Sequence, residues 1–486
     1  MNAELTILET QNKTSLSRDI PEFLLVIGLA FLGIFYLPKF LTYTIFVIFF
    51  ILAWRTKRDY FWFAVCLVFF ANPADFFNQG ASDAQYRLPL FTFAQGLSFN
   101  VTDSFLIIFF LKAIFKSPPY PILIRPVFYI FFFLMFIGIL MAMFYGTDMD
   151  ILVMNLRIYF TVTAVYSFIR LVRNRENIYR FFILISLLMP LVLLEQILNN
   201  NDSSVLSELG KSNVLKFMIF EDTEAKRLTM KGVLINFFCI FLPFAFLKYN
   251  RVAAIWFYFI ILIVVISNFL SATRFWIYSL TGFIALLTLF SFRNISFSFR
   301  MLTISGLIII VALQVEIPSE QFQAILNRIV PAAGSLIEGN IEEVDSGLTR
   351  LEKIKTYKAK IDESKIIGYG FSSGNFNDND LGFWNTLIAF GWVGVTGYSV
   401  MLLYIIYIIT GTLKSSICTA ESKNLLVVLL LGWLIIVLGY LTVWDFFHVG
   451  ADRLFAAVCL MGMIHIVVVE TRLMSINFLK NTINGI

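Results

Sequence analysis

Long apolar runs, joined mostly by short polar connections, fill most of this chain. A helix needs about 20 apolar residues to cross a hydrocarbon core of about 30 Å, and we count about fourteen runs of roughly that length, the first four being short. The expected spans are 23–37, 40–54, 60–72, 101–115, 126–146, 151–169, 178–198, 228–248, 252–271, 275–292, 301–316, 384–410, 425–443 and 453–470. The pattern predicts an all-α polytopic membrane protein.

One long polar segment, 317–383, divides this pattern into helices 1–11 (1–316) and helices 12–14 (384–486). Within it, 321–329 and 348–362 have helical periodicity. The apolar positions of the second stretch, spaced for one face, are Leu348, Leu351, Ile354 and Tyr357. We expect a small helical cap resting on the membrane.

The end of the polar segment carries its most specific features. Gly368-Tyr369-Gly370 predicts a tight turn, and the acidic run Asp378-Asn379-Asp380 follows. The next apolar helix contains Gly391, Gly394 and Gly397.

Composition agrees with a membrane protein and excludes several other classes. The chain is 59% hydrophobic and 14% charged, whereas soluble domains are about 45–50% apolar and about 25% charged. A net charge of +5 is too small to indicate a nucleic-acid partner. The four cysteines have no CxxC spacing, which predicts neither a zinc site nor a disulfide framework.

Basic residues in the short connections set an orientation. The Arg55 to Arg58 loop and every later short basic loop fall on one side, which the positive-inside rule places in the cytoplasm. Both termini are then cytoplasmic, and 73–100, 199–227 and 317–383 are outside. No cytoplasmic loop is long enough for a nucleotide-binding domain, so we expect a substrate that is already energised at the outer face.

Several arginines lie at or near the outer ends of the expected spans. Arg157 lies inside the sixth span, where insertion of an arginine costs about 2.5–3.5 kcal/mol, so it predicts a partner or a watery cavity. Snorkelling toward headgroups is the alternative. Arg227, Arg274, Arg350 and Arg453 are interfacial anchors or, because guanidinium forks suit phosphate oxygens, parts of an anion site.

The candidate acids and bases have structural alternatives. One of Asp378 and Asp380 could cap the following helix. Asp-Asn-Asp also resembles the metal-binding DxD of nucleotide-sugar transferases. We discount a metal site here because this chain has no soluble nucleotide-binding domain. His448, in the last outer connection, is a proton acceptor or an interfacial hydrogen-bonding group. His465 lies within the final span, where we expect it to be packed.

These motifs together resemble the superfamily of bacterial O-antigen polymerases and ligases. The resemblance covers roughly 227–397 and rests on the residues listed here in chain order: Arg227 with Gly232 and Asn236, Ser271 with Arg274, Ser346-Gly347 with Arg350, Gly368-Tyr369-Gly370, Asp380-Leu381-Gly382-Phe383, and Gly391 with Gly394. Ligases of this superfamily carry a histidine at the position of Asp380, whereas polymerases more often show Asp-x-Gly-aromatic. The resemblance therefore favours a polymerase.

The resemblance implies a fold like that of the C-type membrane glycosyltransferases. It also implies polymerisation of undecaprenyl-pyrophosphate-linked oligosaccharide repeat units at the outer face of the bacterial cytoplasmic membrane. Asp380 would be the base, with His448 as its alternative, and Arg350 would neutralise the leaving pyrophosphate. The pyrophosphate would also contact Arg157, Arg227, Arg274, Tyr369 and Arg453. No metal or other cofactor is implied, and the implied partners are the bilayer, a chain-length regulator and a flippase of the same pathway.

Two other functions fit the same sequence. A ligase would move glycan from the same carrier to lipid A core, and a flippase for lipid-linked oligosaccharides has a similar number of helices. A transporter favours paired halves and charges near the midplane. Here the charges gather at the outer ends, which favours the enzyme.

Overall fold

The structure is a computed structural model that describes most of the chain. The described residues are 2–70, 89–94, 97–198, 219–220, 223–226, 233–246, 251–270, 279–280, 282, 345–375, 381–415, 418–442, 447 and 451–484. The loop helix expected at 321–329 and the spans expected at 275–292 and 301–316 lie largely or wholly outside these residues.

Helices make up nearly all of the described chain. The first half contains α1 (Asn2–Tyr36), α2 (Lys39–Arg55), α3 (Asp59–Phe70), α5 (Val101–Phe115), α6 (Arg125–Phe144), α7 (Met149–Phe160), α8 (Thr163–Val172), α9 (Arg175–Ser186) and α10 (Met189–Leu198). The second half contains α12 (Val233–Phe246), α13 (Arg251–Leu270), α17 (Asp345–Glu363), the 3₁₀ helix η2 (Gly370–Asn375), α18 (Gly382–Leu413), α19 (Ala420–Thr442) and α20 (Ala451–Asn484). Two short antiparallel hairpins pair β1 (Pro89–Ala94) with β2 (Leu97–Asn100) and β3 (Ile219–Phe220) with β4 (Thr223–Lys226).

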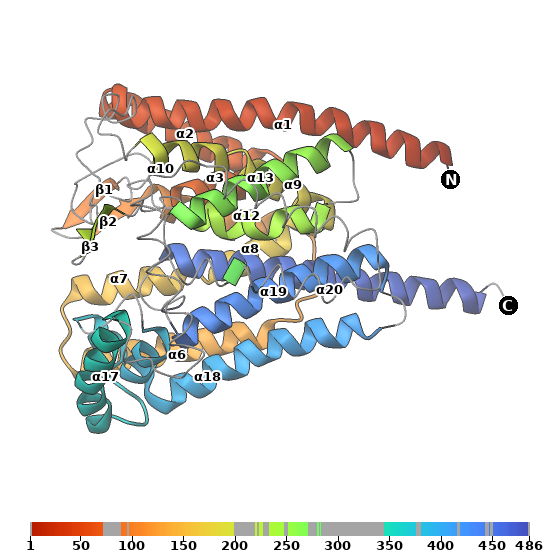
Figure 1. The fold of residues 1–486 in the computed structure, drawn as a ribbon. Helices are drawn as coiled ribbons and strands as arrows, with labels where there is room; N and C mark the ends of the chain where they lie inside the picture. The colour runs from red at the N-terminus through yellow and green to blue at the C-terminus, as the bar shows by residue number, and fades with distance from the viewer. Residues whose placement is uncertain are drawn as a thin grey trace.

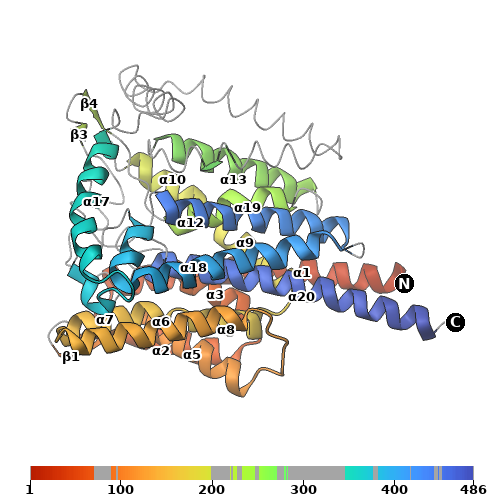
Figure 2. The same ribbon diagram turned by 90° about the horizontal axis from the view of Figure 1, so that it is seen from below.

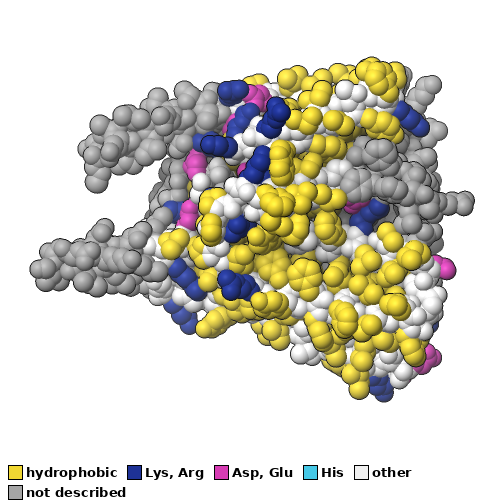
Figure 3. Space-filling model, turned by 180° about the vertical axis from the view of Figure 1, so that it is seen from behind, with side chains coloured by type: hydrophobic (Ala, Val, Ile, Leu, Met, Phe, Trp, Pro, Cys, Tyr) yellow, Lys and Arg dark blue, Asp and Glu magenta, His cyan; other side chains and the backbone are white. Residues whose placement is uncertain are grey.

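The long helices lie side by side in one bundle with two distinct ends (Figure 1). Both chain termini lie at one end, which we name the terminal end. Helix α17 lies across the opposite end, nearly perpendicular to the bundle (Figures 1 and 2), and we name this the α17 end. On the face in Figure 3, hydrophobic side chains cover the middle of the bundle, and Lys and Arg gather toward the terminal end.

Burial differs strongly among the helices. In the most apolar 18-residue stretch of α20, 94% of the residues are buried, whereas in α6 only 28% are. Among the described residues α20 is therefore the central helix, whereas most apolar side chains of α6 are exposed or half-buried, as in a helix in contact with lipid.

The helix boundaries confirm much of the predicted pattern. Helix α5 has the predicted bounds, and α2, α6, α13 and α18 each begin and end within a few residues of prediction. Within the described residues, six helical stretches are long and apolar enough to cross a membrane: Arg125–Phe144, Ile151–Val172, Arg175–Leu193, Gly382–Leu413, Ser422–Leu441 and Arg453–Leu473. They indicate a multi-pass membrane protein, and the total of about fourteen spans stays a prediction.

Two expected spans are each built from two helices. Between α7 and α8 the backbone tightens to i→i+3 hydrogen bonds, and the hydroxyls of Thr161 and Thr163 bond to the carbonyls of Arg157 and Phe160. Between α9 and α10 the break precedes Pro190, the second residue of α10, which has no N–H to continue the helix. The α-helical pattern of the sixth and seventh spans is thus interrupted.

Candidate functional site

The predicted glycine turn docks the end of the polar segment onto the bundle. Gly368 and Gly370 have φ of +73° and +60°, which side chains rarely adopt. A Cβ on Gly368 would lie 2.5 Å from the carbonyl oxygen of Ile388, and one on Gly370 2.5 Å from the Cβ of Met141. The turn therefore requires glycine both for its conformation and for its close approach to α18 and α6.

The residues just before this turn fill a break in α18. Gly391 has φ +57° and ψ −154°, so the helix is interrupted there. The N–H groups of Trp392 and Val393, which begin the second part of α18, donate to the carbonyls of Lys365 and Ile366. The residues that precede the glycine turn thus cap a helix N-terminus inside the bundle.

Helix α17 is held against α18 by the predicted apolar face. Tyr357 and Ile361 are buried and pack with Ile354 against a group on α18 that includes Leu387 and Ile388. The side chains of Leu348 and Leu351 lie outside the described residues, so their part in this face stays a prediction. The helix predicted at 348–362 is confirmed as α17, which lies across the bundle end, and its contact with a membrane stays a prediction.

Helix α7 connects the docked turn to the candidate arginine. The Asn155 side-chain amide donates to the carbonyl of Phe371 in η2 at 3.4 Å, and the rings of Tyr159 and Phe371 lie 5.1 Å apart. Arg157 lies two residues from Asn155, so it projects from the opposite side of α7, toward α5.

Arg157 has the partner that its position predicts. Its Nε lies 3.2 Å from Oδ2 of Asp103, and the two side chains are only 20% and 10% exposed. Asp103 also accepts a hydrogen bond from the backbone N–H of Asn100 in a capping box at the start of α5. The sequence reading missed Asp103. The Asn-x-x-Asp signal before an apolar run predicts the cap, but nothing local predicts the contact with α7.

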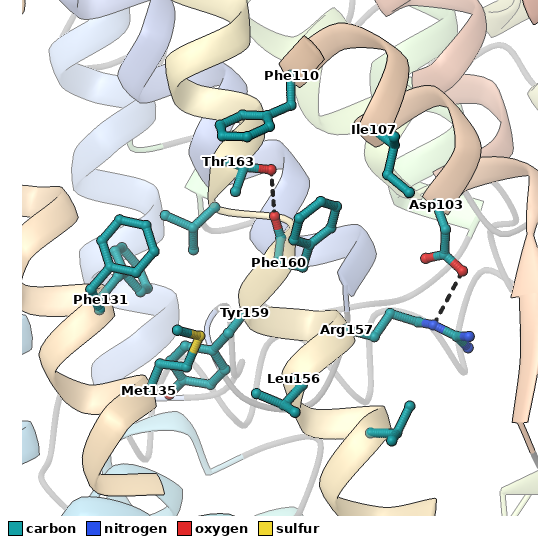
Figure 4. Close-up of a pocket in the computed structure, with 13 residues that line it drawn as sticks. Asp103, Ile107, Phe110, Phe131, Met135, Leu156, Arg157, Tyr159, Phe160 and Thr163 are labelled. Atoms are coloured by element: carbon teal, nitrogen blue, oxygen red, sulfur yellow. Dashed lines mark hydrogen bonds and ion pairs between the residues drawn. The ribbon is translucent and has the colours of Figure 1, made fainter. Parts of the chain in front are cut away.

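A cavity of about 580 Å³ lies beside this ion pair. Figure 4 shows Arg157 reaching toward Asp103 on one side, with aromatic and aliphatic side chains on the other sides. The lining residues are Asp103, Ile107, Phe110, Phe131, Phe132, Met135, Val153, Leu156, Arg157, Tyr159, Phe160, Val162 and Thr163. The space joins an apolar wall to one cation and one anion, a combination suited to an amphiphile.

The remaining candidates are distributed as follows. Arg453 is partly buried in the first turn of α20, which packs against α7. Arg350 lies on α17, with its side chain outside the described residues. Arg227, Arg274, Asp380 and His448 lie outside the described residues, so their predicted roles stay predictions. The structure thus brings Arg157 and the Tyr369 turn into one connected region around α7.

The structure gives Tyr369 a different neighbour from the expected pyrophosphate. Its hydroxyl donates its one proton to Glu363 at 2.5 Å, and the same oxygen lies 3.3 Å from the carbonyl of Lys360. The hydrogen bond to this carboxylate, followed by partial burial, raises the pKa of Tyr369 to about 12. A carboxylate at this distance disfavours a second anion on the same hydroxyl.

Two side expectations can also be compared with the structure. The N-cap residue of α18 is Leu381, which makes no side-chain cap, so neither Asp378 nor Asp380 occupies that position. His465 is fully buried and its Nε2 accepts the backbone N–H of Leu123, which confirms that it is packed.

No family model matches the chain, and no curated protein matches it.

Proposed function

We propose that this protein is a membrane glycosyltransferase that polymerises undecaprenyl-pyrophosphate-linked oligosaccharide repeat units at the α17 end. In this proposal the α17 end faces outward from a bacterial cytoplasmic membrane and both termini are cytoplasmic. The observation that carries the proposal is Arg157, a largely buried cation in the wall of an aromatic and aliphatic cavity.

The cavity supports a lipid-linked donor because such a molecule has the same two parts. A polyprenyl chain needs a long apolar surface, and its pyrophosphate needs cations or N–H donors at the end of that surface. Arg157 lies about two turns into α7, a depth that suits a headgroup just inside the α17 end.

The reaction requires one proton transfer from the acceptor and two bond changes at the anomeric carbon of the donor. An acceptor hydroxyl loses its proton to a base, its oxygen bonds to the anomeric carbon of the donor sugar, and the lipid pyrophosphate leaves with the bonding electrons. We assign the base to Asp380 and charge stabilisation of the leaving group to Arg350 and Arg157, with Arg227, Arg274 and Arg453 as further pyrophosphate ligands. Fixed guanidinium groups act most strongly where water is excluded.

The test is transfer by purified protein in lipid nanodiscs. Lipid-linked repeat units would be incubated with it, and the products separated by gel electrophoresis. A ladder of lengths separated by one repeat unit supports the proposal, and Asp380→Asn should abolish it in protein that remains folded.

Other outcomes select the other functions. Transfer of a single glycan to an added lipid A core acceptor, without a ladder, would make the protein a ligase. Unchanged substrate, together with movement of labelled lipid between leaflets in liposomes, would contradict glycosyl transfer and indicate transport.

A further inference from the structure

Three aromatic side chains meet at the surface of the α17 end, beside the glycine turn. The ring centroids of Phe144 and Tyr145 are 5.2 Å apart, and those of Tyr145 and Tyr369 are 5.3 Å apart. Phe144 is 78% exposed and Tyr145 is 42% exposed. These rings come from the end of α6 and from the glycine turn, which are more than 200 residues apart in sequence.

Hydrogen bonds fix the two backbone segments that carry these rings. Helix α6 ends in a Schellman arrangement, in which the N–H of Thr147 bonds to the carbonyl of Ala142 and that of Gly146 to the carbonyl of Met143. The hydroxyl of Thr147 also lies 2.7 Å from that of Ser372 in η2. Tyr369 is fixed by its own N–H, which donates to Ile388 at 2.8 Å.

Polar groups around the rings favour one class of ligand. Because the Tyr369 hydroxyl donates its one proton to Glu363, its oxygen and the exposed Glu363 carboxylate both offer hydrogen-bond acceptors. The carboxylate would repel a phosphate headgroup or a pyrophosphate, whereas it accepts hydrogen bonds from the hydroxyls of an uncharged sugar.

An aromatic belt at the membrane interface would be enough to explain the exposed rings. It does not explain a carboxylate bonded to one of the tyrosines, because an interfacial tyrosine directs its hydroxyl to water or headgroups. The apolar faces of the rings, together with this hydrogen-bonding pair, match the apolar face and hydroxyl edge of a pyranose.

We propose that Tyr145, Tyr369 and Glu363, with Phe144 at their edge, form a subsite for an uncharged sugar ring of the repeat unit. Tyr145 and Tyr369 stack against the ring, and Glu363 accepts from its hydroxyls. The subsite deepens and rests on the proposed function, because it assigns the polymer's glycan, not its lipid, to this surface. It also moves Tyr369 from the predicted pyrophosphate site to the sugar.

The experiment measures binding separately from transfer. The probe is the free repeat-unit oligosaccharide, released from its carrier by mild acid, and inorganic pyrophosphate is the anionic comparison. Kd values would be measured in nanodiscs for the wild type, Tyr145→Ala, Tyr369→Phe and Glu363→Gln. The matched control is Tyr129→Ala, because Tyr129 is an exposed tyrosine near the other end of α6.

We expect Tyr145→Ala to weaken oligosaccharide binding at least about tenfold, as loss of a central aromatic contact does. Tyr369→Phe and Glu363→Gln should weaken it by smaller factors, and the control should not change it. Saturation-transfer NMR should place sugar ring protons close to the protein in the wild type and less so in Tyr145→Ala. Pyrophosphate binding should be unchanged in all of them.

Two other patterns of Kd values would overturn the subsite. If Glu363→Gln strengthens pyrophosphate binding while no variant changes oligosaccharide binding, the surface is an anion site. If Tyr145→Ala leaves both Kd values unchanged in folded protein, the rings are a membrane belt. Oligosaccharide binding that depends on Tyr145 in protein without transfer activity would refute the proposed function and keep the subsite.

Discussion

At the terminal end, Lys112 inserts its ammonium between the carbonyls of Ala53 and Thr56 and the carboxylate of Asp59, and both charged side chains are less than 10% exposed. At the α17 end, Arg157 meets Asp103 at 3.2 Å, but the pair lines a cavity of about 580 Å³. Lys112 is packed between α2, α3 and α5, and each of its three N–H groups has an acceptor. Arg157 lines the cavity, so its guanidinium can contact a ligand there.

The largest effect that this comparison predicts is at Lys112. Lys112→Met leaves Asp59 as a buried carboxylate without its cation, which costs about 3–5 kcal/mol. We expect a large fall in the thermal unfolding midpoint in detergent. The double variant Lys112→Met/Asp59→Asn should recover part of that loss. A single variant that unfolds at the wild-type temperature would show that this pair does not hold the terminal end.

A smaller effect is expected at Gly391 in α18, where the residues just before the glycine turn dock. In Gly391→Ala, a Cβ would lie 2.4 Å from the Ile366 carbonyl, in a backbone conformation that favours glycine. The strain alone costs about 1–3 kcal/mol. We expect a lower unfolding midpoint and faster proteolysis between α17 and α18.

Gly411→Ala is the matched control because it lies in the same helix and its Cβ would meet nothing within 4 Å. There alanine should stabilise the helix by up to about 1 kcal/mol. Equal effects at both positions would contradict the docking of the turn at Gly391.

The orientation of the two ends in the membrane can be tested with substitutions at exposed positions, which should leave stability unchanged. Ala359 on α17 and Ala420 at the start of α19 are both exposed, at opposite ends of the bundle. A membrane-impermeant maleimide should label Ala359→Cys in intact cells and Ala420→Cys only after permeabilisation. The reverse pattern would place the termini outside and remove the α17 end from the outer face.

These features differ in how far the sequence predicts them. The length of the apolar runs predicts α5 and α18 well because a membrane span needs a continuous apolar stretch, which is visible in the local sequence. The break between α7 and α8 was missed because it has no proline or glycine and is marked only by the hydroxyl bonds of Thr161 and Thr163. Its local signal is present but weak.

The candidate site is less predictable because its contacts join distant segments. Arg157 was singled out by the cost of burying a charge, but its partner Asp103 lies 54 positions earlier. Tyr369 was singled out by the turn motif, but its contact with Tyr145 depends on docking across the bundle end. Such pairs follow from tertiary packing, which one sequence does not display.

The central claim is that Arg157 acts on a ligand and does more than neutralise Asp103. The double variant Arg157→Gln/Asp103→Asn tests it most directly, because it leaves no unpaired buried charge and keeps an acceptor at position 103 for the Asn100 N–H. Elongation of lipid-linked repeat units would be measured in nanodiscs beside the unfolding midpoint. We predict a midpoint near that of the wild type and a rate lower by about 10²–10³. A wild-type rate in this double variant would contradict the account.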